Sequence, residues 1–464
     1  MKDLKNYQET TARPWVRRRL KALLLIALAT LLLLPAAVPA VRKAADAVTP
    51  RTPPPPALPT GDALFPVACS LLPNAVEQDG KLTATAQDGT ILQYSIDTRL
   101  QQSMDDFFGN RRPPYALFIA LEPTTGRVLA LTTSSTGGDW GNDALYRLFP
   151  MASLFKMVTA AAALERNKVT PASEITYRGS AISENPKNWD PRPRGGALKM
   201  DLTDAMGKSV NPIYGKLASD LLGKQAMEAT CTTFGFNRPL IPGIPAAPSQ
   251  ANVPDNVYGL RLMGSGLDHN LKVSPLHAAA ITAAFANNGI LMAPRLIDTA
   301  TRNWAAATLH PPHEVIRVVE PRVAEDLRRM LLTTVSSGTS RKAFRTHNGR
   351  RLLATMQVAA KTGTINGDAP AGQYTWFAAY APANKPRIAL LALVINDGRW
   401  RIKASNVGEH ALTAYFKEEL VAAPAIQPAR GKGQELRKKN TGKTSRHQAA
   451  RKKGARPNRP GRAV

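Results

Sequence analysis

Three short elements of the sequence carry residue types that could do acyl-transfer chemistry. The first, Ser153-Leu-Phe-Lys156, places a hydroxyl and an amine three residues apart at the start of a predicted helix, so both side chains lie on one face. The positive end of a helix dipole favours the charge of an alkoxide. Burial beside another cation would lower the pKa of Lys156 until its amine can accept the serine proton. The spacing therefore predicts an activated serine nucleophile.

The second and third elements add a proton path and a binding strand. Ser209-Val-Asn211 falls between two predicted helices, where the hydroxyl could pass a proton and the amide could contact a peptide backbone. Lys361-Thr-Gly-Thr364 follows the apolar segment 358–360, which predicts a strand whose edge can pair with an extended peptide. The lysine charge and the threonine hydroxyls suit a C-terminal carboxylate, and the glycine lets another backbone come close.

Each element also has an ordinary structural explanation. Ser153 could be a helix cap followed by a surface lysine, and Ser209 and Asn211 could cap the helix that starts at Pro212. Lys361 could protect an ordinary edge strand from pairing with other chains. A purely structural role for these residues requires all three explanations to hold at once.

The ordered set S-x-x-K, S-x-N and K-T-G resembles that of penicillin-binding proteins and serine β-lactamases. The resemblance extends from about residue 94 to residue 415 and is to the penicillin-binding protein transpeptidase domain. The further segments that carry it are 95–101, 122–131, 273–278, 286–289, 337–339 and Trp376-Phe377. Two departures are Ala152 and Ala379, which stand where the family commonly has glycine.

The resemblance implies a D,D-transpeptidase that penicillin inhibits. Ser153 would attack the D-Ala-D-Ala amide and form an acyl-enzyme, with Lys156 as base and Ser209 passing the proton on. Backbone N–H groups of Ser153 and Thr364 would form the oxyanion hole. An amine from a neighbouring stem peptide would then take the acyl group and complete a peptidoglycan cross-link. The substrate-binding residues it implies are Asn211, Lys361, Thr362, Gly363 and Thr364.

Other functions use the same nucleophile or none. A D,D-carboxypeptidase or a β-lactamase would release the acyl group to water, and a peptidoglycan-binding scaffold would not acylate at all. The E-x-x-x-N element of one β-lactamase class follows S-D-N, whereas Glu184 to Asn188 precedes Ser209 here. Gly264-Ser-Gly266 is no esterase elbow, since Met263 stands at its first glycine position. No metal or organic cofactor is implied.

The element pattern predicts an α+β fold. Strands are expected at 115–121 and 128–132, and again at 358–364, 375–380 and 388–395. Between them the spacing predicts helices at 153–166, 202–208, 212–222 and 275–286, and a last helix at 411–420. This order suits an antiparallel sheet covered by helices with an inserted all-helical lobe, as in the β-lactamase/transpeptidase-like fold, preceded by a single transmembrane helix.

The N-terminal region predicts a membrane anchor. Residues 22–41 are uncharged over 20 residues, which is long enough to span a bilayer as a helix. The basic residues before it place the N-terminus in the cytoplasm and the catalytic part outside the bacterial inner membrane. A cleavable signal peptide is the alternative, because Val38-Pro-Ala40 offers small residues near a cleavage point.

The C-terminal tail carries much of the formal net charge of +27. Residues 430–462 hold thirteen lysine or arginine residues and one acidic residue, Glu435, which predicts disorder. The expected topology excludes nucleic acid as its partner and allows an anionic envelope surface. The chain has no room for a glycosyltransferase domain, so that activity would come from a separate partner. Cys69 and Cys231 have no zinc-ligand spacing, and the sequence does not decide whether they pair.

The predicted division follows from these features. It runs as a cytoplasmic basic segment at 1–21, an anchor at 22–41, a proline-rich spacer at 42–60, a lead-in region at 61–110, a transpeptidase domain at 111–420 and a basic tail at 421–464.

Overall fold

The computed structural model describes residues 61–422 apart from positions 139, 194, 240–242, 245, 303–304, 307–310 and 399–401. The predicted cytoplasmic segment, anchor and spacer, and all but two residues of the tail, lie outside the described residues. Within the described part of the chain, no helix combines the length and the apolar character needed to cross a membrane.

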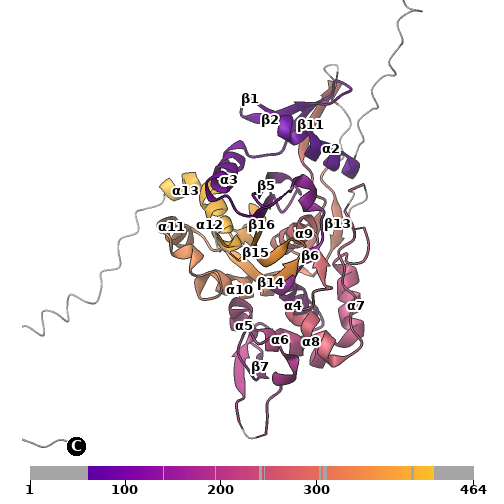
Figure 1. Ribbon diagram of the computed structural model, residues 1–464, viewed down its shortest axis with the longest axis vertical. Helices are drawn as coiled ribbons and strands as arrows, with labels where there is room; N and C mark the ends of the chain where they lie inside the picture. The colour runs from indigo at the N-terminus through magenta and orange to yellow at the C-terminus, as the bar shows by residue number, and fades with distance from the viewer. Residues whose placement is uncertain are drawn as a thin grey trace, which may run out of the picture. The chain divides into compact units, whose positions relative to one another are not determined.

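A five-stranded antiparallel sheet forms the centre of the fold (Figure 1). Its strand order is β14-β15-β16-β4-β5, so strands from both ends of the described chain meet at the β16–β4 pair. The strands are β4 (Tyr115–Leu121), β5 (Val128–Ser135), β14 (Ala359–Asp368), β15 (Ala371–Ala381) and β16 (Ile388–Asn396). The predicted strands are therefore confirmed, and β5, β14, β15 and β16 extend beyond their predicted bounds.

Strand β16 shows why the sheet lies inside the fold. All nine of its residues are buried, and successive side chains alternate between two hydrophobic clusters. Leu391 and Leu393 join one cluster, whereas Leu390 and Val394 join the other. The sequence of a strand that is covered on both faces is a continuous apolar run, because neither face is exposed to water.

Helices cover both faces of this sheet. One face packs against α9 (Pro275–Ala286), and the first cluster that α9 joins also contains α4 (Phe155–Glu165). The other face packs against α3 (Thr98–Arg111) and α12 (Ala404–Tyr415). Helix α9 has its predicted bounds, and the side chain of Ser274 caps it by accepting from the backbone N–H of His277. Further helices are α10 (Pro321–Ser336), η7 (Ala343–Arg345), α11 (His347–Thr355) and α13 (Lys417–Ala422).

The segment between α4 and α9 contains the inserted lobe, which is not all-helical. A hairpin of β7 (Glu174–Tyr177) and β8 (Leu198–Asp201) lies beside its helices, because alternating residues such as Ile175 and Tyr177 give short amphipathic strands. The lobe's helical elements are η5 (Pro186–Asn188), α5 (Leu202–Lys208), α6 (Asn211–Lys216), the π turn η6 (Leu217–Leu222), α7 (Gly223–Thr233) and α8 (Val257–Ser265). The predicted helix 212–222 is thus two elements, α6 and η6.

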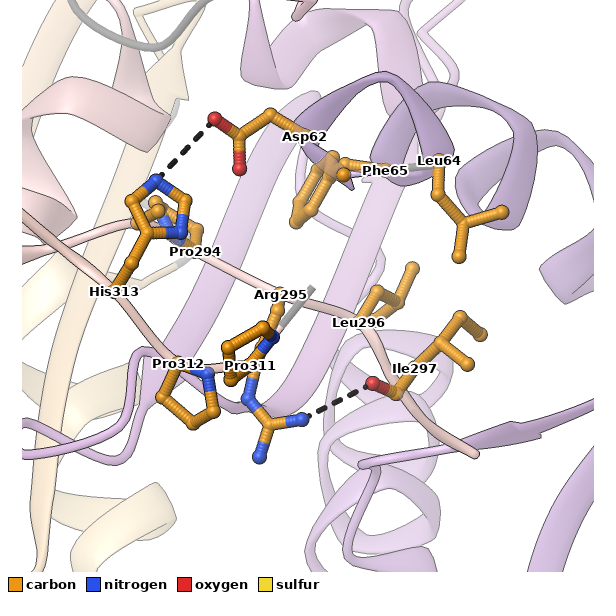
Figure 2. Close-up of a pocket in the computed structure, with 12 residues that line it drawn as sticks. Asp62, Leu64, Phe65, Pro294, Arg295, Leu296, Ile297, Pro311, Pro312 and His313 are labelled. Atoms are coloured by element: carbon orange, nitrogen blue, oxygen red, sulfur yellow. Dashed lines mark hydrogen bonds and ion pairs between the residues drawn. The ribbon is translucent and has the colours of Figure 1, made fainter. Parts of the chain in front are cut away.

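The lead-in region is joined to the rest of the fold through a second sheet of order β1-β2-β3-β11-β12. Its strands β11 (Ile297–Arg302) and β12 (Ala305–Ala306) come from far along the chain. In Figure 2, Leu64 and Phe65 of α2 (Leu64–Leu71) lie beside the start of β11, and His313 pairs with Asp62 at 3.5 Å. The remaining lead-in elements are η1 (Gly61–Ala63), η2 (Leu72–Asn74), β1 (Val76–Gln78), β2 (Lys81–Thr85) and β3 (Ile91–Tyr94).

Short elements complete the described fold. These are η3 (Asn142–Leu145), β6 (Phe149–Pro150), η4 (Ala152–Leu154), β9 (Lys272–Val273), β10 (Ile290–Met292) and β13 (Glu314–Arg317), with β6 pairing β9 and β10 pairing β13. The predicted helix 411–420 is replaced by the end of α12 and the start of α13. Cys69 and Cys231 are both buried and form no disulfide with one another, and burial raises the pKa of the two thiols to about 11 and about 12.

Candidate active site

Ser153 lies in η4, a 3-10 turn of three residues immediately before helix α4. Lys156, one turn further along, is completely buried, and its Nζ donates to Ser153 Oγ at 2.6 Å. The same Nζ donates to Asn211 Oδ1 at 2.7 Å and to the backbone carbonyl of Ser265 at 2.6 Å. The predicted serine–lysine pair is therefore in contact, and two further oxygens hold the amine.

The environment of Lys156 disfavours its charged form. Burial lowers the pKa of Lys156 well below its ordinary value, and the nearby positive charge of Lys361 lowers it further. Lys361 is itself completely buried, which lowers its pKa to about 7. Lowering the pKa of a lysine increases the fraction of its amine that is neutral, and a neutral amine can act as a base.

Ser209 belongs to the part of the site that contains Lys361. The Nζ of Lys361 donates to Ser209 Oγ at 2.8 Å and to the carbonyl of Thr362 at 2.9 Å. Ser209 ends helix α5 in a left-handed conformation, with φ of 56°. Among the described residues, the hydrogen-bond partner of its hydroxyl is Lys361 rather than Lys156, so the structure couples Ser209 to the second lysine.

Asn211 starts helix α6 and is 7% exposed. Its Oδ1 accepts from Lys156, and its Nδ2 donates to the carbonyl of Ser183 at 3.3 Å. Its backbone N–H donates to the carbonyl of Ala181 at 2.7 Å. The loop after β7 therefore holds Asn211 in place. The sequence predicts that Asn211 binds the substrate, and in the structure its side chain also contacts Lys156, the predicted base.

Strand β14 forms the opposite side of the site and is an edge strand of the central sheet. Thr364 is exposed, and Thr362 Oγ1 lies 2.6 Å from Thr339 Oγ1. A Cβ on Gly363 would lie 3.2 Å from the Cβ of Ala152, so the strand passes close to the residue before the nucleophile. An edge strand has backbone groups free to pair with an extended chain.

Three features of the site were not predicted from the sequence. The carbonyl of Ser265 contacts Lys156, and this residue lies in the Gly264-Ser-Gly266 stretch that the sequence analysis excluded as an esterase motif. Any residue type has a backbone carbonyl, so the identity of Ser265 does not indicate this contact. The two glycines beside it were the one local feature of the sequence at this position. Thr339 was noted for its likeness to the family, without a role. Ala152 has a φ of 52°, a conformation that glycine adopts more easily, and this is the position where the family commonly has glycine.

The arrangement combines a hydroxyl, a buried amine and an open strand edge. In its neutral form the lysine amine has two N–H donors and one lone pair, and Asn211 Oδ1 and the Ser265 carbonyl can take the two donors. The lone pair is then left for the hydroxyl of Ser153. This geometry can generate a serine nucleophile beside a strand that can hold a peptide.

Comparisons with known proteins identify the family. The peptidoglycan D,D-transpeptidase PbpA of Mycolicibacterium smegmatis is 26% identical over 373 residues, which cover 71% of this chain and 73% of the relative. The structure resembles the D,D-transpeptidase domain of a peptidoglycan glycosyltransferase from Eggerthella lenta, with a TM-score of 0.59, 20% identity and coverage of 71% of this chain and 83% of that one.

A second structural likeness is to the penicillin G acyl-enzyme complex of penicillin-binding protein A from Mycobacterium tuberculosis. Its TM-score is 0.58 at 24% identity, covering 70% of this chain and 80% of that one. At these identities the two structural matches show a shared fold. The family model described as "Penicillin binding protein transpeptidase domain" matches residues 116–417, which is more than half of the sequence. The chain therefore belongs to the penicillin-binding protein transpeptidase family.

Proposed function

We propose that this protein is a serine D,D-transpeptidase that cross-links peptidoglycan stem peptides through an acyl-enzyme and is inhibited by penicillin. The observation that carries the proposal is the contact of 2.6 Å between Ser153 Oγ and the completely buried Nζ of Lys156. The relative from Mycolicibacterium smegmatis is named a peptidoglycan D,D-transpeptidase, and one structural neighbour is a penicillin G acyl-enzyme complex. Both support the same chemistry here.

The first half-reaction transfers the peptide to the enzyme. The oxygen of Ser153 attacks the carbonyl carbon of the D-Ala-D-Ala amide, while neutral Lys156 takes the serine proton. Backbone N–H groups of Ser153 and Thr364 stabilise the oxyanion of the tetrahedral intermediate. The C–N bond then breaks, D-Ala leaves as an amine, and a serine ester remains.

The leaving D-Ala nitrogen needs a proton in this step. Ser209 is suited to deliver it, because its hydroxyl is hydrogen-bonded to Lys361, whose pKa of about 7 allows either protonation state. In the second half-reaction the amine of another stem peptide attacks the ester carbon. The proton that this amine releases goes to the Ser209–Lys361 pair, which had given one to D-Ala. Lys156 returns to Ser153 the proton that it took in the first half-reaction, and the cross-link amide is formed.

Substrate binding is assigned to the β14 side of the site. The edge of β14 pairs with the extended peptide, and Gly363 allows the close approach. Thr362 and Thr364 donate hydroxyls to the terminal carboxylate, and the charge of Lys361 favours the same group. The remaining N–H of the Asn211 amide, beyond the one bound by Ser183, is available to a substrate carbonyl.

The surroundings of the enzyme form part of the same proposal. Residues 22–41 anchor the chain in the bacterial inner membrane, with the catalytic domain on the outer side. A separate peptidoglycan glycosyltransferase supplies the glycan strands that carry the stem peptides. The basic tail contacts an anionic envelope surface.

A fluorescent penicillin tests the nucleophile. The purified full-length chain is incubated with the label beside Ser153→Ala, free label is removed, and the covalent band is followed in time. A band that persists for hours in the wild type and is absent in the variant is the expected result. A band that decays within seconds while penicillin is consumed would mean a β-lactamase, and no band from a folded wild type would leave only a scaffold.

A second assay separates transfer from hydrolysis. The wild type receives a D-Ala-D-Ala donor peptide with and without an amine acceptor, and both products are measured. A transpeptidase forms the amide product and less free acid as acceptor increases. Free acid at every acceptor concentration would mark a D,D-carboxypeptidase instead.

A further inference from the structure

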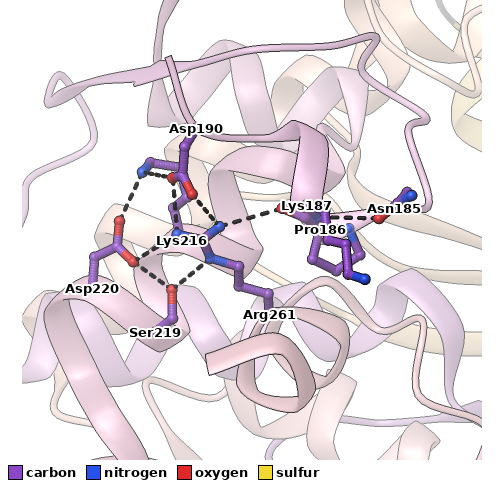
Figure 3. A network of polar contacts seen from close by, with 8 residues as sticks. All are labelled: Asn185, Pro186, Lys187, Asp190, Lys216, Ser219, Asp220 and Arg261. Carbon is purple, nitrogen blue, oxygen red and sulfur yellow. Dashed lines mark hydrogen bonds and ion pairs between the residues drawn. The ribbon is translucent and has the colours of Figure 1, made fainter. Parts of the chain in front are cut away.

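A charged network lies within the inserted lobe (Figure 3). At its centre is Arg261 of α8, whose side chain is 9% exposed. Its guanidinium binds Asp190 twice, from Nη1 to Oδ2 at 2.7 Å and from Nη2 to Oδ1 at 2.9 Å. The same side chain donates to Ser219 Oγ at 3.1 Å and to the Pro186 carbonyl at 3.3 Å. This one residue therefore joins α8 to the η5 segment and to the π turn η6.

Two more residues close the network. Lys216, the last residue of α6, donates to Asp190 Oδ1 at 2.9 Å and to Asp220 Oδ2 at 2.8 Å. Arg261 Nη2 also reaches Asp220 Oδ1 at 3.3 Å. Arg261 and Lys216 hold the pKa of the Asp190 carboxyl down at about 2. Two cations and two carboxylates thus cross-link α6, η6, α8 and the loop that contains Asp190.

The elements that this network joins are those that present oxygens to Lys156. Ser265, whose carbonyl accepts from Lys156, is the last residue of α8, one turn after Arg261. Asn211 begins α6. The carbonyls of Ala181 and Ser183, in the loop that continues to Asp190, accept from its backbone N–H and from one N–H of its side-chain amide. Buried Trp189 ties the two ends of this loop, because its Nε1 donates to Ser183 Oγ at 3.0 Å.

Close packing transmits the position of one element to the next. A Cβ on Gly215 of α6 would lie 2.2 Å from the Trp189 ring and 2.8 Å from the Arg261 carbonyl. A Cβ on Gly264 of α8 would lie 2.3 Å from the Cβ of Ala218. Helices in such contact cannot shift independently, because packed interiors leave no space for a partial movement.

We propose that Arg261, through its pairing with Asp190, is a positioning residue for acylation. It holds the Asn211 and Ser265 oxygens at the spacing that directs the Lys156 lone pair at Ser153. The proposal rests on the proposed serine acyl-transfer function. Stability alone does not account for such a network, because an ion pair with a half-exposed carboxylate such as that of Asp190 contributes little net stability.

The pH at which Lys156 loses its proton should depend on this positioning. The charged group that acts on Lys156 is Lys361 of β14, whereas η4, α6 and α8 present the uncharged oxygens of Ser153, Asn211 and Ser265. If the two helices separate, water reaches the amine and its charged form becomes less costly. The lysine is then neutral only at higher pH.

The test is the rate of acylation by a fluorescent penicillin, measured from pH 6 to pH 10 with the full-length wild type, Arg261→Met and Asp190→Asn. We expect Arg261→Met to lower the rate at pH 7 by about 10- to 100-fold, the scale of a small misplacement of catalytic groups. We expect the midpoint of the pH profile to move to higher pH, so that the loss is smaller at pH 9.5. Asp190→Asn should move the midpoint in the same direction by less, and Arg261→Lys should recover part of the rate.

A matched control removes a comparable ion pair elsewhere. Arg127 binds Asp298 twice, at 2.8 Å and 2.6 Å, near the lead-in sheet, and Arg127→Met should lower the melting temperature without moving the pH midpoint. An Arg261→Met profile with the wild-type midpoint would overturn the proposal, whatever its melting temperature. If Arg261→Met fails to fold, Asp190→Asn decides, because Asp190 is 53% exposed. A wild type without any acylation would instead refute the proposed function, and this inference with it.

Discussion

The two sides of the candidate site are built in different ways. On the sheet side, β14 pairs with β15 along its whole length, from Ala359 opposite Tyr380 to Asp368 opposite Ala371. On the helical side, each functional group lies where a helix begins or ends. Ser153 precedes α4, Ser209 ends α5, and Asn211 begins α6.

This difference decides what holds each side in place. The backbone ladder of β14 positions its residues without help from their side chains. The helix ends have no such ladder, and side chains and carbonyls from distant parts of the sequence hold them together. Single substitutions should therefore affect chemistry more on the helical side than on the sheet side.

The largest expected effect comes from the lysine of the helical side. Lys156→Met removes the base but keeps the length of the side chain, so the acylation rate should fall by about 10²- to 10⁴-fold. The variant should remain folded, because an apolar side chain replaces a buried amine. The measurement is the rate of labelling by a fluorescent penicillin, with melting temperature recorded beside it.

A surface lysine provides the control for this change. Lys224→Met also removes a positive charge, but from an exposed ion pair with Asp255, and should label at the wild-type rate. Near-normal labelling of a folded Lys156→Met protein would show that another group accepts the Ser153 proton, and the helical side would lose its central role.

Two glycines allow the sides to be compared directly. A Cβ on Gly266, after α8, would lie 2.1 Å from the Ala152 carbonyl oxygen, and Gly266 has a φ of 75°. Gly266→Ala combines a backbone clash with a left-handed alanine, so we expect a loss of about 3 kcal/mol in the free energy of unfolding and slower acylation. Gly363→Ala meets only contacts of 3.2 Å in a regular strand and should stay within about 1 kcal/mol of the wild type.

Urea unfolding and acylation rates measure both effects. Equal losses in the two variants would mean that the turn after α8 adjusts as readily as the strand does, and the contrast between the two sides would not hold.

The same contrast explains how much of the fold followed from the sequence. Strands β4, β14, β15 and β16 were predicted because apolar runs bounded by turn residues are local signals. The contact between Ser153 and Lys156 was predicted because three residues span about one helical turn. These features need no knowledge of distant residues.

Features that depend on distant contacts were missed. The pairing of β3 with β11 joins residues about two hundred positions apart, and no local pattern in the sequence indicates it. The Ser265 carbonyl could belong to any residue type, so its role left no signature. The hairpin β7–β8 was overlooked because its strands are only four residues long. Helices α5 and α9 were predicted, whereas α3, α8 and α10 were not, and neither was the meeting of the helix ends at the site.

A last expected effect is a pH dependence of the free energy of unfolding that distinguishes the two buried lysines. An unfolded lysine has the ordinary pKa of 10.5, whereas Lys361 on the sheet side has a pKa of about 7 in the fold. Between these values the unfolded chain binds more protons, so Lys361 makes the free energy of unfolding rise with pH, by at most about 1.4 kcal/mol per pH unit. Below about pH 7 Lys361 is protonated in both states and its contribution to the slope vanishes.

Urea unfolding of the wild type, Lys361→Met and Lys156→Met at several pH values between 6 and 10 measures these slopes. Lys361→Met should lose the part of the rise that begins near pH 7. Lys156→Met should lose another part of the rise below pH 10.5, because burial and the charge of Lys361 lower the pKa of Lys156 in the fold. Removing Lys361 should further raise the pKa of Lys156, so the two losses should not add. Additive losses would mean that Lys156 and Lys361 titrate independently. We expect them to be coupled, because Lys156 binds Ser153, Lys361 binds Ser209, and the charge of Lys361 acts on Lys156.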